Sequence, residues 1–240
     1  MARRARIGRA AALLLPALVF GVLVSAQWRA QQDRSQIAVR YNTPLTEAAS
    51  SLQREQNGLK VQLAELRASL DAIGASAASQ GGAGRELQAR VDALKVRGGL
   101  TPRSGAGVAV LLDDARGPVA PKDVEKAICH ATDITDIVNT AWRGGALAVA
   151  VNDERIVGTS SAYCVGSTIM VNGTLLSPPF QIAVVGPQSA LLAAFDDPSQ
   201  LRDIKQRRDV FGLGLRVSRA AEVRVPAYSG ALTVKRAEAR

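Results

Sequence analysis

A heptad repeat in the first third of the chain constrains the fold more than any other sequence feature. Apolar residues recur every seven positions, at Leu45, Leu52, Leu59, Leu66 and Ile73. A second set lies between them with alternating steps of four and three, at Ala49, Gln56, Leu63 and Leu70. This spacing is typical of a coiled coil, in which such residues form one seam along a helix. The sequence therefore predicts a long helix over residues 44–73 that packs against another helix.

Two residues inside the repeat indicate that this helix depends on a partner. Gln56 is polar at a seam position, which is a known way to fix the register of a coiled coil. Gly58 lowers the stability of an isolated helix by about 1 kcal/mol. The sequence leaves a homodimer and a heteromer open as alternatives.

A segment rich in Gly and Ala, residues 74–85, follows the repeat and predicts a break in the helix. Beyond it, Leu87, Val91 and Leu94 return in the same heptad phase. We interpret residues 44–96 as one coiled-coil stalk with a loosened insert at 74–85. The alternative is that three apolar residues align by chance.

The residues before the repeat are typical of a membrane-directed segment. Residues 10–26 carry no charge, follow four arginines and precede Trp28. With Trp28 as an interfacial anchor, residues 10–28 are predicted to form a transmembrane helix. The basic tail 1–9 would then be cytoplasmic and the body extracytoplasmic, so the chain would be a single-pass protein of the cell membrane. The small residues at 24–26 leave a cleaved signal peptide as the alternative.

The net charge of +9 argues against a nucleic-acid partner because of where it lies. Residues 1–40 hold seven arginines and Asp33, a balance of +6, which leaves +3 for the other 200 residues. Basic residues in the body alternate with acidic ones, as on a solvated helix surface. We therefore expect no nucleic-acid site.

The order of elements in residues 101–228 predicts the fold of the body, with 229–240 as a C-terminal tail. Apolar runs and turn residues predict a strand, a helix interrupted near His130, several strands, two helices and a final strand. The middle strands are predicted at 146–151, 156–163, 167–171 and 180–185. A helical crossover at each end of an antiparallel middle favours a ferredoxin-like split βαβ sandwich of the α+β class.

No catalytic group stands out in the sequence. The only histidine, His130, follows Cys129 directly, and adjacent side chains on a helix point about 100° apart. A metal site formed by these two residues with Asp133 or Asp136 lacks a known ligand spacing. Neither common phosphate-binding glycine motif is present. We expect no enzyme activity, no catalytic residue, no metal and no cofactor.

The two cysteines, Cys129 and Cys164, are candidates for a disulfide because an exported domain permits one. Two separately buried free thiols are the alternative.

Four polar residues at the ends of predicted elements are candidates for a ligand or partner site: Asn139, Asn152, Arg155 and Asn172. Such a site would recognise a peptide, a glycan or another protein, with Arg155 binding an anionic group. The alternative is structural, since Asn is common in turns and an Arg can bind loop carbonyls.

Short motifs across the body carry a family likeness: Asp136-Ile-Val-Asn139, Trp142-Arg-Gly-Gly145-Ala146, Val151-Asn152, Arg155-Ile156, Ser160, Val165-Gly166, Ile169-Met-Val-Asn172-Gly173, Ser177-Pro178-Pro179-Phe180 and Gly186. The chain resembles the YlxW/YlxX-like bacterial proteins, the domain-of-unknown-function family 881, also designated UPF0749. One departure is Leu147, where the family often has Glu.

The resemblance implies a bitopic protein of the bacterial cell envelope, in a family with some members encoded near cell-division genes and no established enzyme activity. We therefore expect a membrane-anchored extracytoplasmic scaffold or regulatory protein associated with division. Its partners would be the membrane, a second stalk helix and other envelope proteins. The alternative is an exported domain that binds a small ligand or a cell-wall fragment.

Overall fold

The chain folds into two compact units, Met1–Gln56 and Asn57–Arg240, joined within one long helix. A computed structural model describes the backbone of residues 2–79, 81–166 and 168–232. Within the first helix, it describes side chains at residues 20–25, at residue 27 and from residue 47 onward. The first unit consists of the beginning of helix α1 (Ala2–Ser79). The second unit contains the end of α1, helix α2 (Gly82–Arg97) and the α+β body.

The predicted transmembrane helix over residues 10–28 requires correction. Within the part of the chain that the structure describes, no helix is long and apolar enough to cross a membrane. The side chains of residues 10–19, 26 and 28 lie outside the described ones. This finding contradicts the predicted span, its role as a signal anchor and the single-pass localisation.

Helix α2 runs back along the end of α1, so the segment predicted as one stalk over 44–96 is a helical hairpin. Lys95 near the end of α2 binds Asp71 of α1. Small residues make this packing close: a Cβ atom at Gly84 would lie 2.7 Å from the carbonyl oxygen of Ala77. The helix break predicted within 74–85 falls between Ser79, where α1 ends, and Gly82, where α2 begins. On both sides of this break the Gly- and Ala-rich segment is helical and forms part of the contact between the two helices.

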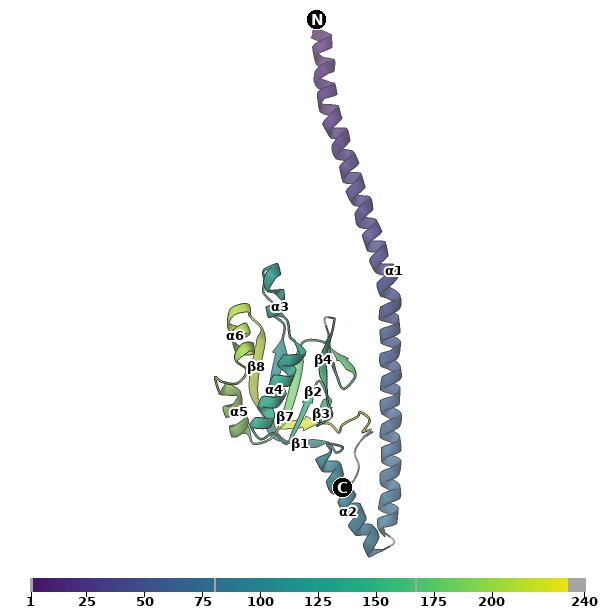
Figure 1. Cartoon of the computed structure of the whole chain (residues 1–240), viewed down its shortest axis with the longest axis vertical. Coiled ribbons are helices and arrows are strands. Elements are labelled where there is room, and N and C mark those ends of the chain that lie inside the picture. Colours follow the sequence, from purple (N-terminus) through teal and green to yellow (C-terminus); the bar gives the residue numbers. More distant parts are fainter. Residues whose placement is uncertain (1, 80, 167, 233–240) are drawn as a thin grey trace. The chain divides into compact units, whose positions relative to one another are not determined.

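The body is built on a five-stranded antiparallel sheet of order β3-β2-β7-β1-β8 (Figure 1). Its strands are β1 (Arg103–Asp113), β2 (Ala148–Val151), β3 (Glu154–Ile156), β7 (Phe180–Val185) and β8 (Gly214–Val225). Strand β7 lies between β1 and β2, and β1 lies between β7 and β8. Helical connections join β1 to β2 and β7 to β8, so both halves are split βαβ units. The predicted ferredoxin-like order thus describes the body, while the transmembrane part of the predicted fold class is wrong.

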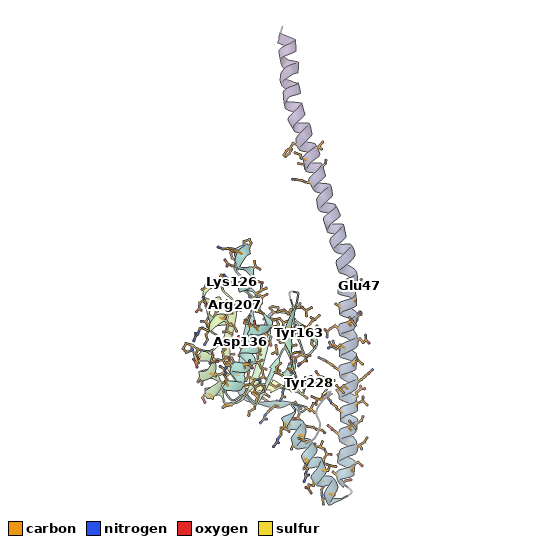
Figure 2. All side chains as sticks on the ribbon, viewed as in Figure 1. Glu47, Lys126, Asp136, Tyr163, Arg207 and Tyr228 are labelled. Atoms are coloured by element: carbon orange, nitrogen blue, oxygen red, sulfur yellow. The ribbon has the colours of Figure 1, made fainter. Side chains whose placement is uncertain are left out.

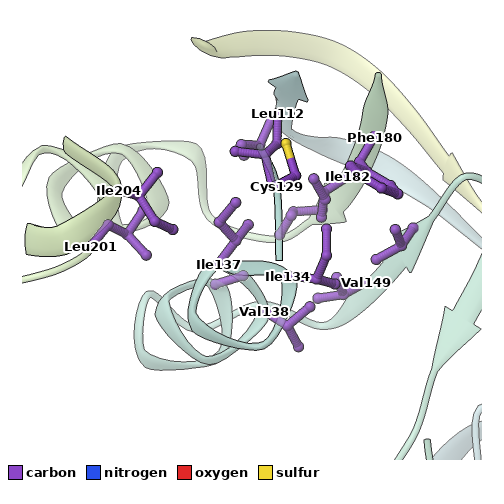
Figure 3. Packing of buried hydrophobic residues seen from close by; sticks show 14 of the residues in the cluster. Leu112, Cys129, Ile134, Ile137, Val138, Val149, Phe180, Ile182, Leu201 and Ile204 are labelled. Atoms are coloured by element: carbon purple, nitrogen blue, oxygen red, sulfur yellow. The ribbon is translucent and has the colours of Figure 1, made fainter. Parts of the chain in front are cut away.

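Helices cover one face of this sheet and enclose the main hydrophobic core. They are η1 (Pro121–Asp123), α3 (Val124–Ala127), α4 (Ala131–Arg143), α5 (Gln188–Asp196) and α6 (Arg202–Phe211). Ile134 and Ile137 of α4 pack with Phe180 and Ile182 of β7, and all four side chains are almost fully buried (Figure 3). The helix predicted after Pro121 is interrupted at residues 128–130, close to the predicted position.

A second, three-stranded antiparallel sheet is inserted between β3 and β7. It consists of β4 (Ala162–Val165), β5 (Thr168–Val171) and β6 (Thr174–Leu176). The predicted strand 156–163 is wrong in its middle, because residues 157–161 form a loop between β3 and β4. This loop forms one wall of the candidate site.

Candidate functional site

A groove of about 180 Å³ lies between helix α4 and the β3–β4 loop. Helix α4 lines one wall with Ile134, Thr135, Val138, Asn139 and Trp142. The loop and the neighbouring strand ends line the other with Ile156, Val157, Ser160, Ser161 and Ala162. The floor is apolar and the rim carries an aromatic ring, an amide and hydroxyl groups, a composition typical of small-ligand sites. Asn139 is the predicted site residue that lines this groove.

The loop wall is held by a compact set of hydrogen bonds. The backbone N–H of Val157 donates to Ser160 Oγ at 2.9 Å, and the N–H of Ser160 donates back to the Val157 carbonyl at 3.0 Å. Asn172 supports the loop from the β5–β6 turn: its N–H donates to the Ser161 carbonyl at 3.2 Å and its Nδ2 to the Arg155 carbonyl at 2.8 Å. Asn172 therefore positions the wall and does not itself line the groove.

The rim of the groove has unused hydrogen-bonding groups. Within the described part of the chain, the Asn139 amide, the Ser161 hydroxyl and the indole N–H of Trp142 have no hydrogen-bond partner. Trp142 is 40% exposed, which is high for a large aromatic side chain beside a hydrophobic core. None of the ten lining residues carries a charge. The groove therefore suits an uncharged ligand with one apolar face.

The other two predicted site residues lie elsewhere. Arg155 is only 5% exposed, and its guanidinium donates to the carbonyls of Thr101 and Pro226. Burial, and then the nearby charge of Arg103, lower the pKa of Arg155 from its ordinary value. Asn152 lies in the β2–β3 turn, where its Oδ1 accepts a hydrogen bond from the Gln181 N–H at 2.6 Å. Arg155 therefore ties loops together, as the structural alternative predicted, and Asn152 fixes a turn.

A polar contact between α1 and the body was not predicted. Lys60 Nζ lies 2.6 Å from Glu154 Oε1 and 2.7 Å from Thr174 Oγ1, and both charged side chains are largely buried. Seven residues further along α1, Arg67 donates to the carbonyls of Tyr228 and Gly230 at 2.8 Å. Two basic residues at the same heptad position are the sequence signal that could have revealed this contact. We call Lys60, Arg67 and Glu154 the helix clamp.

The clamp divides the heptad residues of α1 into two groups. Leu63 is half-buried on the same side of α1 as Lys60 and Arg67. Leu59, Leu66, Leu70 and Ile73 remain 58–66% exposed. We call these four residues the leucine edge. Leu70 also lines a cavity of about 460 Å³ between α1 and α2, which Leu87 and Val91 line from α2. An apolar surface therefore continues from the leucine edge onto α2.

The residues considered for catalysis or metal binding form a structural cluster around Arg207. Its guanidinium lies 2.7 Å from Asp133 Oδ1, donates to the carbonyl of Ile128 and lies 3.2 Å from His130 Nδ1. It also donates to the carbonyl of Lys126, which lies near Arg207 in Figure 2. Asp133 also accepts a hydrogen bond from the His130 N–H at the start of α4. Burial lowers the pKa of Arg207, but its hydrogen bond and charge interaction with Asp133 outweigh this and raise it overall.

Both cysteines are free, so the predicted disulfide is not formed in this structure. Cys129 is buried among Leu112, Phe180 and Ile182 (Figure 3). Burial, and then a hydrogen bond and the charge of Asp114, raise the pKa of the Cys129 thiol well above its ordinary value. Cys164 is exposed on β4, and its Sγ accepts a hydrogen bond from the Ala131 N–H at 3.3 Å. A thiol with a raised pKa is a poor nucleophile because little thiolate forms.

Comparison with known proteins places the chain among bacterial relatives. UPF0749 proteins of Mycobacterium bovis and Mycobacterium tuberculosis are 26% identical over 204 residues, which covers 83% of this chain and 66% of each relative. The UPF0749 protein YlxW of Bacillus subtilis is 33% identical over 99 residues, covering 41% of this chain and 43% of that protein. The chain thus spans just under two thirds of the length of these mycobacterial relatives.

The crystal structure of an uncharacterized conserved protein from Mycobacterium tuberculosis is 24% identical, with a TM-score of 0.49, and covers 63% of this chain and 99% of that one. A family model described as a bacterial protein of unknown function (DUF881) matches residues 90–238. This match covers more than half of the chain and confirms the family resemblance seen in the sequence. The chain therefore belongs to the bacterial protein family DUF881.

Proposed function

We propose that this chain is a non-catalytic scaffold protein that assembles with a second copy of itself through the leucine edge of α1. The observation that carries this proposal is the exposure of Leu59, Leu66, Leu70 and Ile73, each more than half accessible on one helix. A contiguous exposed apolar surface of this kind marks an interaction site in soluble proteins. Single exposed leucines would need no such explanation.

The size of the leucine edge supports a stable contact. Full burial of one Leu or Ile side chain contributes about 1.5–3 kcal/mol. Four side chains that are about 60% exposed therefore contribute on the order of 5 kcal/mol per chain when covered. The exposed Leu87 on α2 extends the surface that a partner helix would cover.

A second copy fits this surface because the heptad pattern complements itself. Leu59, Leu66 and Ile73 occupy equivalent positions at seven-residue spacing. In a parallel pair, each packs against its own counterpart, as d positions do in two-stranded coiled coils. On the side of the edge away from the clamp, Gln62 and Ser69 are uncharged, and a Cβ atom at Gly58 would meet nothing within 4 Å. They leave room for a close approach.

The environment of Cys129 and His130 supports a role without catalysis. The raised pKa of Cys129 disfavours its thiolate, and Nδ1 of His130 faces the Arg207 guanidinium. The Cys129 thiol is therefore a poor nucleophile, and Nδ1 of His130 is engaged by a structural side chain. Binding through surfaces is the activity that the remaining features support.

The test is the oligomeric state of the whole chain carrying Leu59→Asp and Leu66→Asp. We expect these substitutions to weaken self-association by about 100-fold or more, because two charges would be buried in the contact. The matched control is Val61→Asp with Ala68→Asp. Val61 is as exposed as Leu59, at 58%, but lies two residues further along and so on the far side of the helix.

Analytical ultracentrifugation of the three proteins gives the answer. A wild-type dimer that persists in the control and is lost in the Leu59/Leu66 variant supports the proposal. A wild-type chain that is monomeric at about 100 µM would refute it, since a functional contact of this size should hold at that concentration. Equal association of all three proteins would also refute it.

A further inference from the structure

We propose that the groove between α4 and the β3–β4 loop is a binding site for one ring of an uncharged sugar. This site is separate from the leucine edge, so the inference does not depend on self-association. It rests on three properties of the groove: its neutral lining, its exposed indole and its unpaired polar groups.

The absence of charged side chains in the lining indicates an uncharged ligand. Thr135, Asn139, Ser160 and Ser161 supply the polar atoms of the rim, and none of the lining side chains is charged. An anionic or cationic ligand would lose its hydration in the groove without meeting an opposite charge, which is unfavourable. Phosphate, carboxylate and ammonium compounds are therefore poor candidates.

The exposed indole of Trp142 indicates a ligand with a flat apolar face that can stack on it. Trp142 is 40% exposed at the rim, while Val138 beside it is buried. The C–H groups on one face of a pyranose ring form an apolar surface that can stack on the electron-rich face of an indole. The volume of about 180 Å³ is the size of a single sugar ring.

Unpaired polar groups on the rim of the groove indicate a ligand with hydroxyl groups at the edge of its ring. The Asn139 amide offers donors and an acceptor, and the Ser161 hydroxyl offers one of each. Neither has a partner within the described residues, so each can bond a sugar hydroxyl without breaking an internal bond. The loop that carries Ser161 is already held by Asn172 and by the Val157–Ser160 pair, so little ordering entropy is lost on binding.

The competing occupant is an aliphatic side chain of a peptide, which would also fill an apolar floor. Such a ligand would leave the amide of Asn139 and the hydroxyl of Ser161 unpaired beneath it, and buried polar groups without partners are costly. The polar rim therefore favours the sugar.

Intrinsic fluorescence provides the test because the chain has two tryptophans, Trp28 and Trp142. In the full chain with Trp28→Phe, Trp142 is the only tryptophan, and excitation at a wavelength that the three tyrosines do not absorb reports on it alone. We expect titration with N-acetylglucosamine to shift its emission saturably, with a Kd on the order of 1 mM, as suits a one-ring contact. Glucosamine and glucuronate, which carry charges, should bind at least about tenfold more weakly.

Substitutions in the Trp28→Phe background separate the groove from the rest of α4. Asn139→Ala should weaken binding at least about tenfold by removing the rim amide. Asp136→Ala, exposed on the same helix and absent from the lining, should leave the Kd unchanged. The N-acetylglucosamine tetramer distinguishes the source of the ring: tighter binding than the monomer indicates a glycan chain, and equal binding indicates a free sugar or a chain end.

Three results would overturn the proposal. The first is no saturable change up to about 100 mM sugar, a concentration far above the expected Kd. The second is an unchanged Kd in the Asn139→Ala protein. The third is displacement of the sugar by acetyl-leucine amide at lower concentration than the sugar itself needs, which would assign the groove to a peptide side chain.

Discussion

Arg207 shows how one buried side chain can organise several loops. Its guanidinium joins α6 to Asp133 at the start of α4 and to the carbonyls that precede that helix. Arg suits this position because its planar group presents five donors in a fixed geometry. Asp133 also accepts a hydrogen bond from the backbone N–H of His130. Its carboxylate therefore balances the charge of Arg207 at the start of α4. The neighbourhood of His130 and Asp133, which the sequence did not favour as a catalytic or metal site, holds a structural ion pair.

The cysteines give a prediction at the residue scale. At about pH 8, iodoacetamide should modify exposed Cys164 and leave Cys129 unmodified until the protein is unfolded. The raised pKa of Cys129 also has a consequence for stability, because the unfolded thiol ionises at lower pH than the folded one. Its contribution to folding stability is complete below the ordinary pKa of 9.0 and declines as the pH rises above that value.

Mass spectrometry of the labelled protein checks this prediction, with Cys164→Ser as the control that should take up no label when folded. Failure of both cysteines to react in the unfolded, unreduced chain would show that they form a disulfide in solution. That result would restore the pairing expected from the sequence.

Residue patterns anticipated only part of the candidate groove. Asn139 was identified because it is polar near the end of a predicted helix. Trp142, three residues later on the same helix surface, was not identified because a large aromatic residue usually belongs to the core. Ser161 could not be recognised, since residues 156–163 were predicted as one strand. The loop depends on bonds from Asn172 that connect distant parts of the chain.

At the scale of elements, the helix clamp gives α1 two different sides. One side carries Lys60 and Arg67, which bind the body, and the other carries the leucine edge. The sequence predicted one seam formed by both sets of heptad positions. It could not separate them, because the acceptors of the clamp are Glu154 and backbone carbonyls from residues 228 and 230, far along the chain.

Breaking the clamp should destabilise the second unit. Lys60→Met leaves the buried Glu154 carboxylate without its cation, and the loss of one partner of a buried pair costs about 3 kcal/mol. In that variant the Thr174 hydroxyl still donates to Glu154 Oε1 at 2.6 Å, but Oε2 has no hydrogen-bond partner among the described residues, and a neutral hydroxyl does not replace the lost cation. Adding Glu154→Gln to Lys60→Met should recover part of the loss by removing the buried charge.

Urea unfolding followed by circular dichroism measures these differences. Lys95→Met is the matched control, because it removes the cation from Asp71, which is more than half exposed and stays hydrated. We expect this control to cost less than about 1 kcal/mol, as for other exposed pairs. Equal losses for Lys60→Met and Lys95→Met would show that the clamp contributes no more than a surface ion pair.

At the scale of the whole molecule, the order of elements determined how much of the fold was predictable. Apolar runs such as those of β1, β2 and β7 alternate with amphipathic helices, and that order alone favours two split βαβ units. The hairpin of α1 and α2 was missed because its basis is the close contact of small residues such as Ala77 and Gly84, which pattern analysis interprets as flexible. Properties that depend on packing between distant segments therefore had to come from the structure.

The clamp and the leucine edge together predict that self-association and folding are coupled. The end of α1 belongs to the same compact unit as the body, so a second copy bound to the leucine edge stabilises the native state of that unit. A tenfold rise in protein concentration adds about 1.4 kcal/mol per dimer to the free energy of unfolding. For a chain of this size we expect the Tm to rise by about 2 °C for each tenfold increase in protein concentration.

Differential scanning fluorimetry between about 1 and 100 µM measures this dependence of Tm on concentration across the range in which a contact of this size should form. The Leu59→Asp and Leu66→Asp protein should show no slope, while the Val61→Asp and Ala68→Asp control should keep it. A wild-type protein that forms dimers but has a concentration-independent Tm would show that the helix separates from the body before the body unfolds, and the clamp would then not couple the two.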